Sequence, residues 1–366
     1  MNAAATDKDA LSGASDGPRS PGATHRSSYR GLIARRMTIL GAAGTILAVA
    51  CFADILIGPA FLNVSDVIGA LLQPDSADQT TAAIVHIIRL PMTCMALLVG
   101  AALGIAGTHM QTILGNPLAS PYTLGFSAAG GFGAATAILL GISFPLLPDL
   151  TVPIAAFAMA GLAAFTVYGF ARLRGMSAEV MVLAGIATLF LFQSLQSMAQ
   201  YLASPEVLQQ IVFWLFGSML KANWTNVSIT AVIVLVGAVA LIPDLWKLTA
   251  LRLGDDRATA IGVDVRRLRM KVFAVVALLT AGAVSFVGTI GFVGLVAPHI
   301  ARMLVGEDQR ILVPMAAVTG AAILVGASII SKLLSPGTVV PIGIVTAVIG
   351  VPFLYSLILN RSRRLW

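Results

Sequence analysis

The chain has 366 residues, of which 58% are hydrophobic and only 11% are charged, with a mean hydropathy of +0.92. This composition excludes an ordinary soluble domain, and the net charge of +7 lies in short clusters between apolar runs, unlike a nucleic-acid-binding surface. Each run of about 20 apolar residues can cross a hydrocarbon core of roughly 30 Å. The runs do not alternate in polarity as barrel strands would, so we predict an all-α polytopic membrane protein.

The N-terminal segment 1–35 is rich in Ser, Ala, Gly and Asp in its first 30 residues and has no hydrophobic stretch typical of a signal peptide. Too few apolar residues are present to bury a core. We expect a disordered cytoplasmic tail over 1–35 and one transmembrane domain over 36–366.

Hydropathy predicts about ten membrane spans after this tail. They are expected near 37–57, 90–112, 119–141, 150–171, 179–201, 224–243, 270–289, 292–304, 311–333 and 341–359. The uncharged stretch 272–301 is too long for one span, and GTIGFVG at 288–294 divides it. Nearly all Lys and Arg residues then fall on one side, which the positive-inside rule assigns to the cytoplasm together with both chain termini.

Three basic residues remain on the opposite side, namely Arg89, Lys221 and Lys332. Two short surface helices are expected there as well, one at SDVIGALLQ (65–73) and one within PEVLQQIVFWLFGSML (205–220). Cys51 and Cys94 lie in apolar runs and are interpreted as small apolar side chains without a disulfide or a metal.

The positions of the ionisable residues bear on the energy source. The acidic residues map to loops, the tail or span ends, and His109 is the one ionisable residue expected within a span, as a buried neutral side chain. An ion-coupled secondary transporter is therefore disfavoured but stays open as an alternative. The sequence contains no G-x-x-x-x-G-K-[ST] nucleotide motif, so ATP, if used, would be bound by a partner.

A partner of that kind would find its docking site in the charged island GDDRATAIGVDVRRLRMK (254–271). Asp255 or Asp256 can cap a short helix, and Gly262 can end it in a left-handed conformation. Ala258 and Ala260 are small enough to pack into a partner's cleft. The alternative interpretation is an ordinary solvated cytoplasmic loop.

Four blocks carry a family resemblance. RLPMTCMALLVGAALGIAGTHMQTILGNPLASPYTLG (89–125), LGDDRATAIGV (253–263), TIGFVGLVAPHIARML (289–304) and PIGIVTAVIGVPFLYSLIL (341–359) occur in this order. They resemble the FecCD-type permease family, the membrane subunits of ABC importers for ferric siderophores, haem and cobalamin. The resemblance runs from about residue 40 to the C-terminus and implies a type II importer architecture. Its implied partners are a second permease subunit, two cytoplasmic ATPases and an extracytoplasmic substrate-binding protein, in the cell inner membrane.

The resemblance also implies roles for individual residues. The coupling segment is expected within 247–271, and the residues that would contact the ATPase are Leu253, Gly254, Asp255, Asp256, Arg257, Ala258, Ala260, Ile261 and Gly262. The two constrictions of the pathway would be formed by Asn116, Pro117 and Leu118, and, less closely matched, by Met176, Ser177 and Ala178. Arg89 and Lys332 would meet acidic residues of the binding protein.

Some positions depart from the family pattern. Relatives often carry Arg, Asp and Glu where this chain has Met92, Ser328 and Val339, and Gly115 replaces an Arg before the N-P-L segment. Either a different second permease subunit supplies the missing charges, or the binding protein is atypical.

We therefore predict a non-enzymatic permease subunit that imports an iron chelate. A ferric siderophore is preferred because it is the commonest substrate of the family that the chain resembles, with haem or cobalamin as alternatives in the same family. A permease-like scaffold without transport is a further alternative. The pathway is expected to be polar but uncharged, with Gln111, Thr123, Ser127, Gln193 and Gln196. Such a lining suits a fully coordinated metal better than a bare cation. No cofactor or protein-bound metal is expected, and His299 and Arg302 are interpreted as a hydrogen-bonding pair.

Overall fold

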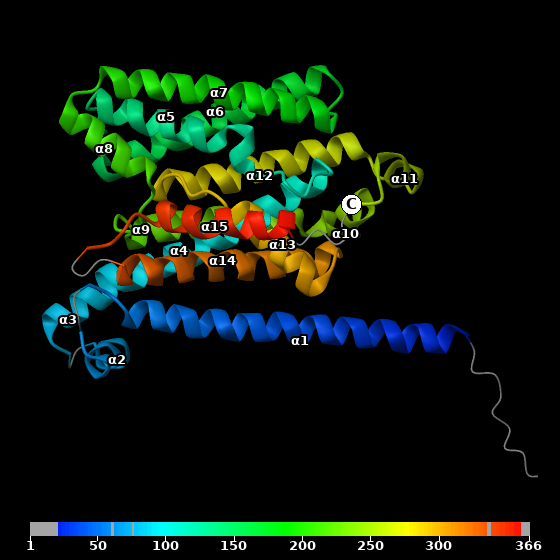
Figure 1. Cartoon of the computed structure of the whole chain (residues 1–366), viewed down its shortest axis with the longest axis horizontal. Helices are drawn as coiled ribbons and strands as arrows, with labels where there is room; N and C mark the ends of the chain where they lie inside the picture. The colour runs from blue at the N-terminus through cyan, green and yellow to red at the C-terminus, as the bar shows by residue number, and fades with distance from the viewer. Residues whose placement is uncertain (1–20, 60–61, 75–76, 335–337, 360–366) are drawn as a thin grey trace, which may run out of the picture.

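The computed structural model describes residues 21–59, 62–74, 77–334 and 338–359, and this part of the chain contains helices and no strand (Figure 1). The longer helices lie side by side with their axes nearly parallel. The elements are α1 (Pro21–Leu56), α2 (Val64–Leu72), α3 (Gln79–Ala83), η1 (Ile84–Arg89), α4 (Leu90–Ile113), η2 (Pro121–Leu124), α5 (Phe126–Leu139), η3 (Pro148–Leu150), α6 (Thr151–Leu173), α7 (Ala178–Leu202), α8 (Pro205–Leu215), α9 (Trp224–Leu241), η4 (Ile242–Asp244), α10 (Leu245–Leu251), α11 (Asp255–Ala260), α12 (Val265–Val287), α13 (Val293–Val305), α14 (Gln309–Leu333) and α15 (Ile342–Leu359).

The predicted spans are confirmed in the described residues. Seven helices are long and apolar enough to cross a membrane, and three shorter apolar helices, 126–139, 293–305 and 342–356, occupy the remaining predicted positions. The two short surface helices are present as α2 and α8. Figure 1 shows α2, α3 and α8 at one end of the bundle and α11 at the other. We refer to these as the α8 end and the α11 end.

The N-terminal boundary differs from the prediction. Helix α1 begins at Pro21, so residues 21–35 are helical where a disordered tail was expected. No proline follows Pro21 within this helix, and an established span can be extended at little cost because each added residue gains a hydrogen bond without a new nucleus. Residues 1–20 lie outside the described part, as do the basic residues at 361–364.

Helix α4 forms the centre of one half of the bundle, where it packs against α14, α12, α13 and α9. Its close approach to α14 depends on glycine. A Cβ atom on Gly100 would overlap the Gly320 carbonyl oxygen, and one on Gly104 would overlap that of Ala316. These two glycines are four residues apart and form the small-residue face that lets membrane helices pack closely.

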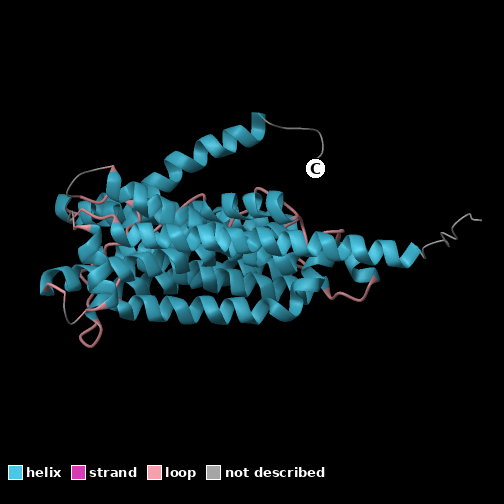
Figure 2. Cartoon of the chain, turned by 90° about the horizontal axis from the view of Figure 1, so that it is seen from below, coloured by secondary structure: helices cyan, strands magenta, loops and turns pink. Residues whose placement is uncertain are grey.

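The other half of the bundle consists of α5, α6, α7 and α8, and α12 packs against α5 and α6 to join the two halves (Figure 1). In the perpendicular view α15, the last described helix, diverges from the bundle (Figure 2). Residues of α15 accordingly leave large apolar side chains exposed, including Val348 and Tyr355.

Three breaks between helices meet inside the bundle. The backbone N–H of Ser218 donates to the Val287 carbonyl (2.8 Å), while those of Ile342 and Gly343 donate to the Gly217 and Phe216 carbonyls (both 3.0 Å). Backbone groups outside helices must find partners within the protein at membrane depth, and these three segments satisfy one another. The sequence break expected at 288–294 is therefore one side of a packed junction.

Candidate functional site

The charged island folds into a short helix as predicted, but the residue at its N-terminal cap is not the one expected. Gly254 precedes α11 with φ +103° and ψ 157°, and the cap position has no side-chain hydrogen bond. The expected caps, Asp255 and Asp256, are instead the first two residues of the helix, where their charge still favours its N-terminus. Gly254 occupies the cap position because the backbone there takes a conformation that other residues rarely adopt. Gly262 ends the segment at φ +87°, as expected.

The side chains of α11 divide between two faces. Ala258 is fully buried within the chain, which differs from the prediction that it packs into a partner. Leu253 and Ile261 are 60% and 57% exposed. The remaining exposed residues of the predicted coupling set are Gly254, Asp255, Asp256, Arg257, Ala260 and Gly262. The segment thus presents apolar and charged side chains together at the α11 end.

Arg269, near the start of α12, lies under this helix and was not predicted from the sequence. Its Nη1 and Nη2 atoms donate to Asp255 Oδ2 (2.7 Å) and Oδ1 (2.9 Å), and its Nε atom donates to the Ile113 carbonyl (2.9 Å). The residue is only 8% exposed. Nothing in the sequence distinguishes Arg269 from the neighbouring Arg266 and Arg267, because only the fold brings Ile113 beside it.

The first predicted constriction follows α4 directly. Gly115 turns the chain at φ +59°, and Asn116 Oδ1 accepts the backbone N–H of Leu118 (2.9 Å) in a tight turn. Asn116 is exposed, Pro117 is half-buried and Leu118 is 54% exposed. The turn is therefore open at the surface of this chain.

The second predicted constriction lies between α6 and α7. Met176 has φ +62° and a buried side chain, while Ser177 caps α7 by accepting the backbone N–H of Val180 (3.4 Å). Ala178 begins the helix. The role of both turns as constrictions stays a prediction.

A groove of about 520 Å³ opens beside the junction of the three helix breaks. No formally charged side chain lines it; the lining residues are Ser120, Tyr122, Thr123, Leu215, Phe216, Thr289, Gly291, Phe292, Leu295, Gly343, Ile344, Ala347 and Val348. Phe292 has φ +66°, which is unusual for a bulky residue, and its ring lies where a Cβ on Gly350 would stand. The segment after α4 and the first turns of α15 thus both line the groove.

The polar residues predicted for the pathway are only partly on this groove. Thr123 lines it, whereas Gln111 is fully buried, donates to the Leu295 carbonyl (3.4 Å) and accepts Arg302 Nη2 (2.8 Å). Ser127 is buried, Gln193 is exposed, and Gln196 lies against Gly131.

Arg302 does not bond to His299 as expected. It pairs with Glu307 (3.1 Å) and with Gln111, and the His299 ring lies edge-on to Phe353 with centroids 6.0 Å apart. His109 is fully buried, as expected, and neither ring nitrogen has a hydrogen-bond partner in the described part of the chain.

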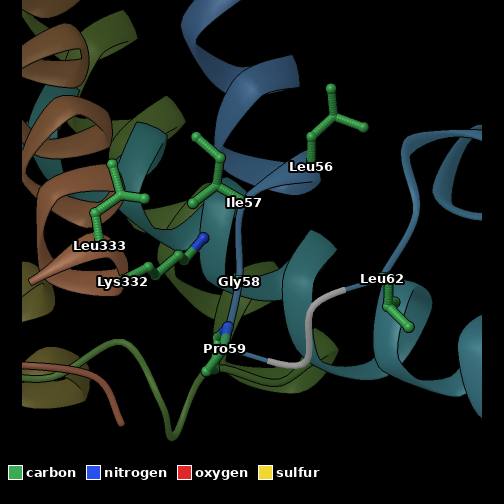
Figure 3. A pocket seen from close by; sticks show the side chains of 7 residues that line it. All are labelled: Leu56, Ile57, Gly58, Pro59, Leu62, Lys332 and Leu333. Atoms are coloured by element: carbon green, nitrogen blue, oxygen red, sulfur yellow. The ribbon is translucent and has the colours of Figure 1, made fainter. Parts of the chain in front are cut away.

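Arg89 and Lys332 are both buried at the α8 end. Arg89 Nη1 donates to the Ile55 and Leu56 carbonyls (2.9 and 2.8 Å), and Lys332 Nζ lies 2.7 Å from Asp54 Oδ1. Lys332 borders a pocket of about 260 Å³ and points toward the Ile57–Gly58 segment (Figure 3). Their exposed fractions are 3% and 5%, so neither cation ends in solvent as a docking residue would.

Two acidic residues expected in loops or at span ends are buried, Asp54 within the span predicted at 37–57 and Asp244 directly after the span predicted at 224–243. Asp54 is paired with Lys332, and Asp244 accepts Lys247 and Lys271, both at 2.6 Å. Each carboxylate is thus compensated by at least one lysine, which is how ionisable groups are usually accommodated within a bundle.

Comparisons with known proteins agree with this architecture. The profile of the FecCD transport family matches residues 46–360. The chain belongs to the FecCD transport family.

Two relatives show the range of this family. The cobalamin import system permease protein BtuC of Halobacterium salinarum is 37% identical over 287 residues, covering 78% of this chain and 76% of the relative. The iron(3+)-hydroxamate import system permease protein FhuB of Bacillus subtilis is 34% identical over 321 residues, covering 87% and 82%.

A solved structure extends the FecCD comparison to the fold. It is described as an inward-facing conformation of a metal-chelate type ABC transporter, and it matches with a TM-score of 0.79 and 30% identity. The match covers 88% of this chain and 99% of that one. The chain is therefore a multi-pass membrane permease of an ABC importer family, and its relatives are named for the import of cobalamin or iron(3+)-hydroxamate or for the transport of hemin.

Proposed function

We propose that this chain is the permease subunit of an ATP-driven importer that moves a ferric siderophore into the cytoplasm. The observation that carries the proposal is the groove of about 520 Å³, whose lining residues include hydroxyls and apolar side chains but no formal charge. Such a surface suits a bulky chelate whose metal is already coordinated, because a bare cation would need carboxylate or imidazole ligands. Haem and cobalamin fit the same reasoning, and uptake assays decide among them.

The energy would come from two ATPase subunits docked at the α11 end, each binding its own ATP. The exposed Leu253 and Ile261 supply an apolar contact, and Asp256 and Arg257 supply charges beside it. Mixed apolar and charged patches of this kind are common at the centre and rim of protein interfaces. The α11 end and both chain termini would then face the cytoplasm of the cell (inner) membrane.

The pathway would run between this chain and a second permease subunit, either a copy or a different chain. The exposed apolar side chains on α15 and the open groove beside them support that arrangement. Asn116, Pro117 and Leu118 would form one cytoplasmic constriction, and Met176 and Ser177 would form the other, since both turns connect span ends on the same side of the bundle.

An extracytoplasmic binding protein would deliver the chelate at the α8 end. Because Arg89 and Lys332 are buried, we propose that they act indirectly, by fixing the Ile55–Gly58 segment that the binding protein would meet.

The test is purification of the chain from native membranes, identification of its partners by mass spectrometry, and reconstitution of the complex in proteoliposomes. We expect an ATPase in a 1:1 ratio with permease subunits, and ATP-dependent uptake of a ferric hydroxamate in preference to hemin and cobalamin. Preference for hemin or cobalamin would change the substrate and keep the importer. Recovery of the chain alone, with uptake driven by an ion gradient, would overturn the proposal.

A further inference from the structure

Arg269 connects α11 to the C-terminal end of α4 through hydrogen bonds. The short helix packs mainly on its sequence neighbours α10 and α12. Through Asp255 and Arg269 it is also joined to the Ile113 carbonyl, which belongs to the last residue of α4. A continuous series of hydrogen bonds thus leads from α11 through Arg269 to the end of α4, directly before the turn at Asn116.

The two contacts of this guanidinium have different physical grounds. The bond to Asp255 is bidentate, so it fixes orientation as well as distance. The bond to Ile113 satisfies a carbonyl at a helix C-terminus, where no intrahelical donor is available and a cation is favoured. Because Arg269 is only 8% exposed, water screens its contact with Ile113 less than it would at the surface, whereas the Asp255 side chain is 51% exposed.

The other basic residues of the island make different connections. Arg267 pairs with Asp264 at the start of its own helix, and its side chain is 85% exposed. Lys271 binds Asp244, next to α10. Arg266 makes a long contact (3.4 Å) with the Arg172 carbonyl.

We infer that Arg269 is the positioning residue that transmits displacement of α11 to the cytoplasmic end of α4, and so couples ATPase movement to the constriction at Asn116–Leu118. The inference rests on the proposed function, since it assumes that an ATPase docks on Leu253–Gly262. Closure of the ATPase dimer would move α11, the forked pair with Asp255 would carry Arg269 with it, and the Ile113 carbonyl would follow. The turn at Gly115–Leu118 begins two residues later.

The experiment uses the purified complex in proteoliposomes and compares Arg269→Ala, Arg269→Lys and the control Arg267→Ala. Three quantities are measured: the ATPase-to-permease ratio, the rate of ATP hydrolysis, and ferric hydroxamate taken up per ATP hydrolysed. We expect Arg269→Ala to keep the complex and its ATP hydrolysis, and to lower uptake per ATP about tenfold, as loss of a charge-assisted hydrogen bond would. Arg267→Ala should match the wild type in all three.

The outcomes separate this inference from the proposed function. If the wild-type complex contains no ATPase, the proposed function fails first. If the complex forms and Arg269→Ala equals Arg267→Ala in uptake per ATP, the inference is wrong. Loss of the ATPase from the Arg269→Ala complex would assign the residue to docking and also overturn it. Should Arg269→Ala fail to fold, Arg269→Lys decides: it keeps the charge without the fork, and unchanged coupling would contradict the inference.

Discussion

Lys332 and Asp54 form a buried ion pair that joins α14 to α1 at the α8 end. Lys332 Nζ lies 2.7 Å from Asp54 Oδ1 and 2.8 Å from the Asp54 carbonyl oxygen, and Thr93 Oγ1 donates to Asp54 Oδ2 at 2.6 Å. Three helices therefore converge on one carboxylate. Ser328, the position at which the family pattern implies an acid, is buried one helical turn before Lys332. We interpret Asp54 as the substitute for that missing acid.

The pair gives a stability prediction. Asp54→Ala leaves the Lys332 ammonium buried without a counter-charge, and such a loss typically costs about 3–5 kcal/mol. Thermal unfolding in detergent should shift clearly to lower temperature. Adding Ser328→Asp to Asp54→Ala should recover much of the loss, because residues four apart on a helix lie side by side.

Asp66→Ala is a suitable control, since Asp66 is exposed on α2 at the same end. It should change the midpoint little. A midpoint for Asp54→Ala equal to that of the control would show that the ion pair makes no net contribution to stability. Failure of Ser328→Asp to restore stability would contradict the interpretation that Asp54 takes the place of an acid at position 328.

The sequence predicted the elements well because membrane spans leave a strong one-dimensional signal. All ten predicted spans correspond to helices, and the break near 288–294 was placed from its glycines. Contacts between distant residues leave no such signal. Asp54 looked like an ordinary span-end acid, and its partner lies 278 positions away.

The errors within the candidate site have the same origin. Ala258 could face a partner or its own chain, and periodicity over a six-residue helix does not decide between them. Asp255 is an acceptable helix cap by residue type, but Arg269 engages its carboxylate.

The residues 21–35 have a composition typical of disorder, but the span that follows extends through them as helix.

The contact between α4 and α14 gives a packing prediction. Gly104→Val would drive a side chain into the Ala316 carbonyl, and overpacking of this kind costs about 1–3 kcal/mol or prevents assembly of the bundle. We expect a lower unfolding temperature and a smaller monodisperse fraction on size-exclusion chromatography. Gly161→Val is the matched control, because nothing lies within 4 Å of a Cβ at Gly161. Equal behaviour of the two variants would show that the helices separate without cost.

The loop before α14 gives a pH prediction. Arg310 donates to the Asp308 carboxylate, and this hydrogen bond holds the pKa of Asp308 below its usual range despite partial burial. Since the folded pKa is the lower one, the stabilisation is present above the unfolded pKa of about 4 and is lost as pH falls through the folded value. The melting temperature of the wild type should exceed that of Asp308→Asn near neutral pH, and the difference should shrink under acid conditions. Asp308 also caps α14 by accepting the backbone N–H of Arg310, and a difference independent of pH would assign the effect to this cap and not to the charge.

The exposed face of α11 gives a prediction about docking. Under the proposed function, Ile261→Asp places a carboxylate where an apolar side chain would enter the ATPase, and a buried interface anchor of this kind is worth on the order of 2 kcal/mol, or about thirtyfold in Kd. The fold should be unaffected, because Ile261 is 57% exposed in the isolated chain. The measurement is titration of the purified ATPase against the permease in nanodiscs. Leu173→Asp is the control, since Leu173 is 81% exposed at the end of α6. Comparable weakening by both variants would mean that the ATPase covers a wider surface than α11. An unchanged Kd for Ile261→Asp would show that this face of α11 does not contact the ATPase.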